Sequence, residues 1–313
     1  MSDKKIIAVV GATGAQGGGL VRAIHADPNS PFRARAITRD PNSEAAQALA
    51  ALGAEVVGAD LQDGDSIDRA FRGAHGAYCV TFYWAHMSPE RELAEARTLA
   101  ESAEQEGVKH VIWSTLEDTR NWVPLSDNRM PTLMDEYKVP HLDVKGQAND
   151  FFRTVPTTFL LTSFYWDNLI SFGMNPKPDG EGGYVFTLPM GEAKLPGIGA
   201  EDIGRCAYGM FKDESTIGKV IGVSGEHLTG AEMAAVLSEV LGVPVKHHSP
   251  SFDEFRSYGF PGADDLGNMF QFKHDFEADF RRARDPEVAR RLNPALQDFR
   301  AWVTANKDRI PLT

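Results

Sequence analysis

A glycine-rich turn near the start of the chain contains the residues best suited to bind a phosphorylated ligand. Gly11, Gly14 and Gly17 recur at every third position, directly after the apolar run 6–10 and at the start of an amphipathic segment. The helix that follows would present unpaired N–H groups and a positive dipole end to phosphate oxygens. This strand–turn–helix setting favours a dinucleotide site over a simple flexible turn. The predicted cofactor contacts are Gly11, Ala12, Thr13, Gly14, Ala15, Gln16 and Gly17.

A basic residue follows the second apolar run, where the two nicotinamide dinucleotides are usually distinguished. The sequence there reads Thr38-Arg39-Asp40. An acidic side chain would bind the ribose 2′-hydroxyl of NAD, whereas the Arg39 guanidinium can pair with the 2′-phosphate of NADP. We therefore expect NADP(H) as the cofactor, with NADPH preferred over NADH. The alternative is that Arg39 is a solvated surface arginine, and neighbouring Asp40 weakens the local positive charge.

The ends of the third and fourth apolar runs supply further candidate contacts. Ligands of open parallel sheets bind outside the carboxyl ends of the strands, so residues that follow these runs should line the site. Asp60 and Leu61 are expected to meet an adenine ring. Thr81, Phe82 and Tyr83 are expected over the ribose or the nicotinamide.

These candidate residues require elements that bring them to one edge of a sheet. Short apolar runs alternate with longer amphipathic segments through the first half of the chain, which is typical of a parallel sheet covered on both faces. Right-handed crossovers would make it a Rossmann-like, doubly wound α/β fold. The expected strands are 6–10, 33–38, 55–57, 77–82, 110–114 and 158–161. The expected helices are 18–25, 43–52, 66–71, 89–106 and 143–152.

The alternation loosens in the second half, which predicts a second, smaller C-terminal α/β domain. Residues 116–140 contain three prolines and little periodicity, so we expect a long loop over the carboxyl edge of the sheet. We assign residues 1–165 to the NAD(P)-binding domain, with 198–225 returning to it. Residues 166–313 are then a smaller domain for a substrate or partner.

The glycine turn and the Thr38-Arg39-Asp40-Pro41 stretch resemble the NmrA-like branch of the short-chain dehydrogenase/reductase superfamily. The stretches 164–168 and 259–270 match this branch too, so the resemblance covers nearly the whole chain. It implies NADP(H) in an extended Rossmann domain beside a smaller C-terminal domain. It also implies that Tyr165, Trp166, Asp167 and Asn168 lie beside the cofactor. Members of the family include redox-sensing regulators and reductases.

The catalytic motif of that superfamily is altered here. Active members carry Tyr-x-x-x-Lys on a helix, and the corresponding stretch reads His141-Leu142-Asp143-Val144-Lys145. Lys145 is expected to bind the nicotinamide ribose. His141 is either a proton donor or a packing or substrate-contacting residue, and Tyr165 is an alternative acid. The missing tyrosine favours an NADP(H)-responsive regulatory module. The alternative is an NAD(P)H-dependent reductase acting on a small carbonyl, quinone or imine-like acceptor.

Composition excludes several other classes of function. Lys and Arg total 32 against 44 Asp and Glu in 313 residues, a net charge of −12, so direct nucleic-acid binding is not expected. Two cysteines exclude a disulfide framework, and His247-His248 lacks partners at metal-ligand spacing, so no metal site is predicted. With no targeting or membrane segment evident, we expect a cytoplasmic protein. A small-molecule acceptor, a protein partner and a homodimer all stay open.

Overall fold

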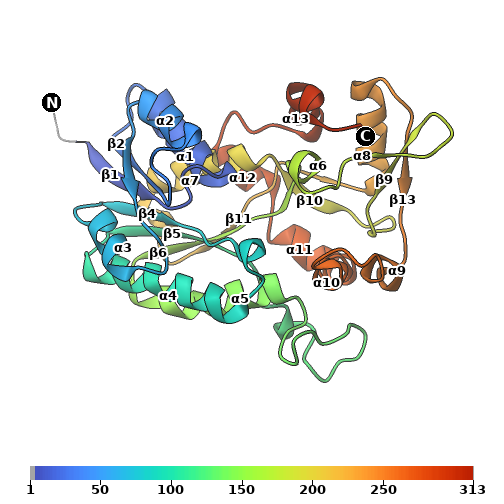
Figure 1. Cartoon of the computed structure of the whole chain (residues 1–313), viewed down its shortest axis with the longest axis horizontal. Coiled ribbons are helices and arrows are strands. Elements are labelled where there is room, and N and C mark those ends of the chain that lie inside the picture. Colours follow the sequence, from blue (N-terminus) through green and yellow to red (C-terminus); the bar gives the residue numbers. More distant parts are fainter. Residues whose placement is uncertain (1–3, 313) are drawn as a thin grey trace.

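A seven-stranded sheet, parallel throughout, forms the centre of the larger part of the molecule (Figure 1). The computed structural model describes residues 4–312, so residues 1–3 and 313, at the outer limits of the two predicted domains, lie outside it. Strand order reverses between β4 and β2, on either side of β1, and such a switch point opens a crevice at the carboxyl edge. Across the sheet the strands are β11 (Val220–Gly222), β6 (Thr157–Leu161), β5 (His110–Thr115), β4 (Gly76–Cys79), β1 (Lys5–Val9), β2 (Phe32–Thr38) and β3 (Glu55–Gly58).

Helices cover both faces of this sheet because its central strands are apolar on both sides. In β1, Ile7 and Val9 pack with one buried cluster, whereas Ala8 and the adjoining Val10 pack with the other. This alternation follows from the two-residue period of a strand. The first face carries α1 (Ala15–Ala26), α2 (Glu44–Ala51) and α7 (Ala200–Phe211), and the second carries α3 (Gly64–Phe71), α4 (Pro89–Gln105) and α5 (Pro140–Ala148). The predicted Rossmann-like fold is confirmed.

Two elements end earlier than the sequence predicts. The strand expected over 77–82 stops at Cys79, because its neighbour β1 ends at Val9, which pairs with Tyr78. The chain then turns through the short 3-10 helix η1 (Tyr83–Ala85). The helix expected over 143–152 begins earlier, at Pro140, and ends at Ala148, where a 3-10 turn continues over 149–154. Proline at the first helical position explains the early start. The N–H that proline lacks would have no partner within the helix at that position, so nothing is lost.

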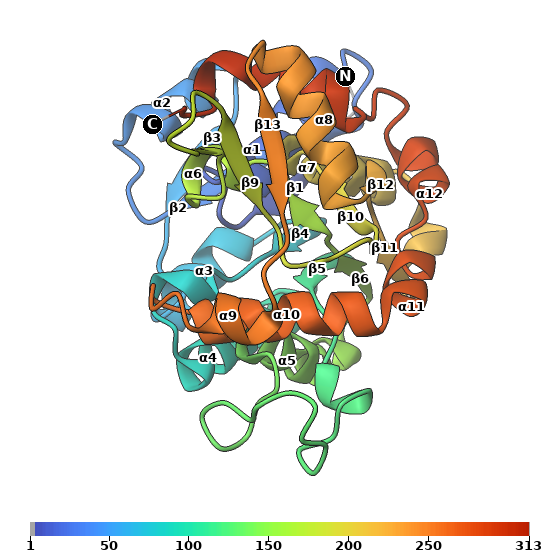
Figure 2. The ribbon, with the colours of Figure 1, turned by 90° about the vertical axis from the view of Figure 1, so that its right-hand side faces the viewer.

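The remaining elements form a smaller region beside the carboxyl edge of the large sheet (Figure 2). Its two three-stranded sheets have the orders β12-β10-β7 and β13-β9-β8, and one buried apolar cluster joins them to the helices. None of the helices described in residues 4–312 has the length and apolar character of a membrane span. The strands are β7 (Phe164–Tyr165), β8 (Lys177–Pro178), β9 (Tyr184–Thr187), β10 (Leu195–Ile198), β12 (Glu226–Leu228) and β13 (Val245–His248). The helices of this region are α6 (Asn168–Ser171), α8 (Gly230–Leu241), α9 (Phe252–Arg256), α10 (Ala263–Asp275), α11 (Glu277–Arg282) and α13 (Phe299–Asn306). The helix α12 (Pro286–Leu292) instead packs against α7, with Ala289 in the apolar cluster on the first face of the large sheet.

The long segment between β5 and α5 joins the two regions. Its middle projects beyond α5 (Figures 1 and 2), and its backbone accepts hydrogen bonds from α10, including Asn268 to the carbonyl of Pro131 at 2.9 Å. The buried Asp143 carboxylate fastens both ends of the segment. It accepts the backbone N–H of Thr119 at 2.7 Å and that of Val139 at 2.9 Å. One carboxylate in α5 therefore fixes the loop that leads into that helix.

We predict that Gly204→Ala destabilises the protein by about 1–3 kcal/mol, although alanine is the better helix former. A Cβ at Gly204 would lie 2.2 Å from the backbone nitrogen of Leu20, so α7 and α1 would have to separate. Chemical denaturation measures the change. Gly64→Ala in α3 is the control, because its Cβ would meet only Thr98 Cγ2 at 3.9 Å. Equal stabilities of the two variants would contradict the prediction.

Candidate functional site

The glycine turn connects β1 to α1 by close contacts between backbone atoms. Gly11 has a φ of +63°, a left-handed conformation that favours glycine. A Cβ at Gly17 would lie 2.5 Å from the Gly11 carbonyl oxygen, so a side chain there would push the helix off the strand. These two positions explain why the turn needs glycine for reasons of space and conformation.

The start of α1 leaves room for an anionic ligand. Gly14 is the N-cap and supplies no side-chain cap, and no acidic residue occupies the first helical turn. Thr13, Gly14 and Ala15 are exposed, whereas Ala12 is buried beneath them. The first-turn N–H groups of a helix have no partner within the helix, so they can bind phosphate oxygens here. The predicted turn residues thus fit a dinucleotide phosphate.

The Gln16 side chain connects the glycine turn to the ends of several strands. Its amide oxygen accepts hydrogen bonds from the Tyr78 hydroxyl and, at 2.9 Å, from Ser114 Oγ. Its amide nitrogen donates to the Tyr165 hydroxyl, which lies 3.4 Å from Thr162 Oγ1. Burial raises the pKa of Tyr165 to about 12, so the phenol is neutral near pH 7. A ligand on the turn would therefore meet a neutral phenol whose O–H can donate a hydrogen bond.

The residues expected around the adenosine half are accessible. Arg39 follows β2 and is exposed, and it forms no hydrogen bond or ion pair with any other residue in 4–312. Its guanidinium is free to meet an anion from solvent. Asp60 is exposed and Leu61 is half-buried at the end of β3, where the Asp60 backbone N–H is bonded to Ser66 Oγ at 3.0 Å.

The three candidates after β4 have different surroundings. Thr81 is buried and bonded to Lys145. Phe82 is 56% exposed and meets Phe172 edge to face, with ring centroids 6.4 Å apart. Tyr83 is buried, and its ring lies 6.3 Å from that of His141. Phe82 is therefore the one of the three that presents an apolar ring to solvent.

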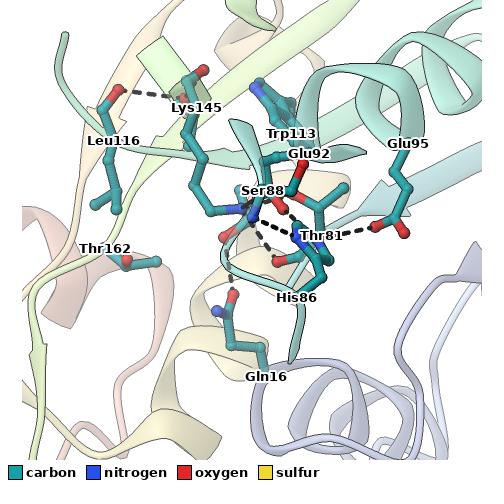
Figure 3. Close-up of polar contacts among 12 residues, drawn as sticks. Gln16, Thr81, His86, Ser88, Glu92, Glu95, Trp113, Leu116, Lys145 and Thr162 are labelled. Atoms are coloured by element: carbon teal, nitrogen blue, oxygen red, sulfur yellow. Dashed lines mark hydrogen bonds and ion pairs between the residues drawn. The ribbon is translucent and has the colours of Figure 1, made fainter. Parts of the chain in front are cut away.

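Lys145 points from α5 into a buried polar cluster (Figure 3). Its ammonium donates to the Thr81 carbonyl at 3.1 Å and to Thr81 Oγ1 at 2.7 Å, and it lies 2.7 Å from Glu92 Oε1. Thr81 Oγ1 in turn donates to Glu92 at 2.5 Å. The three N–H groups of the ammonium thus have three acceptors within the protein.

The cluster continues along α4 on the other side of Glu92. His86 Nε2 lies 3.3 Å from Glu92 Oε2 and 3.8 Å from Glu95 Oε2, while its Nδ1 accepts the Ser88 N–H at 3.0 Å. Arg91 binds the far oxygen of Glu95 at 2.8 Å. Burial on its own raises the pKa of Glu92, but the adjacent Lys145 ammonium and the hydrogen bonds to the carboxylate hold that pKa below its ordinary value.

His141, near the start of α5, is bound to the smaller region. Its Nδ1 lies 2.7 Å from Asp265 Oδ1 in α10, and its backbone N–H donates to the other carboxylate oxygen at 3.2 Å. The Trp84 ring lies 4.7 Å from the imidazole. An imidazole with Nδ1 fixed by a carboxylate has its tautomer and orientation set, which leaves Nε2 for a further partner.

Of the four candidates in 165–168, Tyr165 contacts the glycine turn. Trp166 is 1% exposed and packs in the core of the smaller region against Phe299 and Trp302. Asp167 accepts the Ala200 N–H at 2.8 Å and so caps α7, and burial raises the pKa of Asp167. Asn168 begins α6. Roles for the last three beside a cofactor stay predictions.

The comparisons with known proteins agree with this geometry. The family model described as "NmrA-like family" matches residues 3–302. The chain belongs to the NmrA-like family. The NmrA-like family domain-containing oxidoreductase FrzB of Cladobotryum sp is 33% identical over 288 residues, which cover 85% of this chain and 83% of that protein.

Solved structures share the fold at lower identity. NmrA, a negative transcriptional regulator in complex with NADP, has a TM-score of 0.78 and 24% identity over 96% of this chain and 94% of that one. The Citrobacter sp. triphenylmethane reductase complexed with NADP(H) has a TM-score of 0.73 and 22% identity over 96% and 99%. The family thus includes proteins described as oxidoreductases, and the fold includes both a regulator and a reductase.

Sequence reasoning missed the partners of the two helix-borne candidates. Glu92 is a charged residue on the apolar stripe of α4, with Ala96, Leu99 and Ala103, and that placement is a signal that could have identified it. Asp265 carries no such signal, because its partner His141 lies 124 positions away.

We predict that Glu92→Gln lowers the free energy of unfolding at pH 7 by roughly 3–5 kcal/mol, because it leaves a buried ammonium without its counter-ion. A carboxylate with a lowered folded-state pKa stabilises the protein above its unfolded value of 4.5 and loses that contribution as pH falls through the folded pKa. The gap between the stabilities of wild type and variant should therefore narrow as the pH falls below 4.5. Denaturation at several pH values measures it, with exposed Glu101→Gln on the same helix as control. A gap independent of pH would contradict this assignment.

Proposed function

We propose that this protein is an NADPH-dependent reductase of a small carbonyl, quinone or imine-like acceptor. The glycine turn, the uncapped start of α1 and the open Arg39 guanidinium support NADP(H) as the cofactor. The related oxidoreductases, and the NADP complexes of two proteins with the same fold, support it independently. A bound NADPH would supply the hydride, so the protein has to bind the acceptor and provide a proton.

The pair formed by His141 and Asp265 is the observation that carries the reductase proposal. Both side chains are buried, and the carboxylate holds Nδ1 at 2.7 Å. A carboxylate in this position orients the ring and stabilises it when it carries a second proton, as in other His–Asp pairs. His141 and Lys145 are four residues apart on α5 and share a helical face, so Nε2 of His141 is the proposed proton donor to the acceptor.

A regulatory role is the second candidate, and a separate observation favours it. The Lys145 ammonium and the Tyr165 phenol are both engaged inside the protein. A cofactor that competes for these groups would change contacts at the junction of the two regions. Such a module would bind NADP(H) without turnover, and the similarity to the regulator NmrA agrees with this alternative.

Arg39→Ala should weaken NADPH binding about ten- to a hundredfold while leaving NADH binding nearly unchanged. A charge-assisted contact with the 2′-phosphate contributes roughly 1.5–3 kcal/mol, and about 1.4 kcal/mol corresponds to tenfold in affinity. Titration calorimetry with both dinucleotides provides the measurement. Arg33→Ala is the matched control, because Arg33 is an exposed arginine of β2, the strand that Arg39 follows. Equal affinities for NADPH and NADH in the unmutated protein would refute the Arg39 assignment.

His141→Ala and Asp265→Asn should each reduce kcat by about a hundredfold in NADPH oxidation with quinones and aldehydes, the range expected on losing a positioned acid. His274→Gln, an exposed histidine in α10, should retain full activity. A loss confined to Tyr165→Phe would make Tyr165 the proton donor instead. Absence of turnover across the panel, with NADPH still bound, would favour the regulatory role.

A further inference from the structure

The Lys145 ammonium has no N–H left for a ligand in the free protein. Its three acceptors are Thr81 O, Thr81 Oγ1 and Glu92 Oε1, at 3.1, 2.7 and 2.7 Å. In Figure 3, Gln16 of the glycine turn lies below this ammonium and Glu92 lies to its upper right. A dinucleotide bound on the turn would compete with Glu92 for the ammonium. Contact with such a ligand requires Lys145 to release an acceptor.

Glu92 cannot easily stay charged once the ammonium turns away. The side chain is completely buried, and its Oε2 has no hydrogen-bond partner among the described residues. Burial favours the neutral acid, and the adjacent Lys145 ammonium is the main opposing influence on the pKa of Glu92. Withdrawal of the ammonium thus favours proton uptake by the carboxylate.

His86 is placed to deliver that proton. Because its Nδ1 accepts the Ser88 N–H at 3.0 Å, the neutral ring carries its hydrogen on Nε2, which lies 3.3 Å from Glu92 Oε2. Neither atom has a hydrogen-bond partner among the described residues, so the ring has to turn slightly for this N–H to point at the carboxylate. The side chain is 7% exposed, so the ring touches solvent at one edge. An imidazole can take a proton from solvent and pass one inward near neutral pH.

We propose that Glu92 is a positioning residue that holds Lys145 in the free protein and takes up a proton through His86 when a bound dinucleotide draws the ammonium away. This inference rests on the proposed cofactor binding. If Glu92 takes up a proton in this way, NADP(H) affinity depends on pH through a residue that does not touch the cofactor. His86 gives its Nε2 proton to Glu92 Oε2, while its Nδ1 releases the Ser88 N–H and takes the replacement proton from solvent. Lys145 stays protonated.

The other charged groups around Glu92 are already accounted for. Glu95 on the same helix is paired with Arg91 at 2.8 Å. Tyr83 of η1 has a pKa raised by burial and by nearby acids, so its phenol is neutral near pH 7. Lys145 of α5 and His86 are the remaining charged or titratable groups that face Glu92 in the described part of the chain.

A divalent cation is the competing occupant, because ligand atoms of His86, Glu92 and Glu95 lie within 4.8 Å of one another. Two observations favour a proton instead. The Ser88 N–H leaves Nε2 of a neutral His86 protonated and unable to ligate. Lys145 and Arg91 already balance the two carboxylates, so a divalent ion would add two buried positive charges.

Calorimetry of NADPH binding in buffers of different ionisation enthalpy counts the protons taken up. Between pH 6 and 8, wild type and Glu101→Gln should take up more protons than Glu92→Gln and Lys145→Met, by an amount approaching one. NADPH affinity should accordingly rise by up to about tenfold for each unit that the pH falls, relative to those two variants. The 2′-phosphate titrates in every variant, so the difference between variants isolates Glu92. Lys145→Met tests the same point if Glu92→Gln folds poorly. In Lys145→Met, Glu92 has lost its ammonium partner and is already neutral before NADPH binds.

Each outcome decides the proposal. Equal proton uptake in all four proteins, with NADPH bound, would overturn it and leave the proposed cofactor intact. Failure of NADPH to bind at all would instead remove the cofactor assignment together with this inference. Saturable binding of Zn²⁺ alone that is lost in His86→Gln would establish a metal site and overturn the proton assignment.

The route through His86 has its own readout. His86→Phe should keep the number of protons taken up but slow their uptake about tenfold or more in stopped-flow mixing with a pH indicator. Added imidazole should restore the rate. An unchanged rate in His86→Phe would show that the proton reaches Glu92 by another path and would overturn the role of His86.

Discussion

The close approach of backbone to backbone at the glycine positions is the constraint on which the rest of the structure depends. The Gly11 carbonyl occupies the space of a Cβ at Gly17, and the backbone of α1 occupies that of a Cβ at Gly204. Because α1 begins directly at the end of β1 and lies against α7, its N-terminus faces the switch point of the sheet. The same contacts bring Gln16 to Tyr78 and Ser114, at the ends of two neighbouring strands. A single bulky residue in this set would therefore move the binding edge as well as the core.

Two buried ion pairs lie at this edge, although the chain has a net charge of −12. Lys145 faces Glu92, and Arg284 forms a two-pronged pair with Glu117 in which the arginine is fully buried. Removing one member of such a pair leaves a buried charge uncompensated, which costs more than the pair contributes. These ion pairs fix the orientation of their side chains. A ligand that binds one member of a pair leaves the other without its counter-ion and so favours a change in its protonation. This coupling is the physical link between cofactor binding and proton binding.

The two regions of the chain meet through polar contacts that surround the carboxyl edge. Tyr165 reaches Gln16, Asp265 holds His141, and Arg284 donates to the Thr162 carbonyl at 2.7 Å as well as to Glu117. Each contact joins a residue of the larger region to one from a later part of the chain. A ligand that alters Gln16 would act on this junction. For that reason the same architecture can serve catalysis or regulation.

The sequence by itself determined the features that depend on local spacing. Glycine every third residue after an apolar run, and the alternation of apolar and amphipathic segments, specified the Rossmann-like sheet and the turn. The four-residue spacing of His141 and Lys145 specified a shared helical face. Tertiary structure alone decided what those two side chains meet, because Glu92 and Asp265 come from helices that only the crossovers bring to α5. It also decided that Trp166, the residue after β7, packs in the core of the smaller region while its neighbour Tyr165 reaches the turn, since only the packing of the two regions assigns each side chain its surroundings.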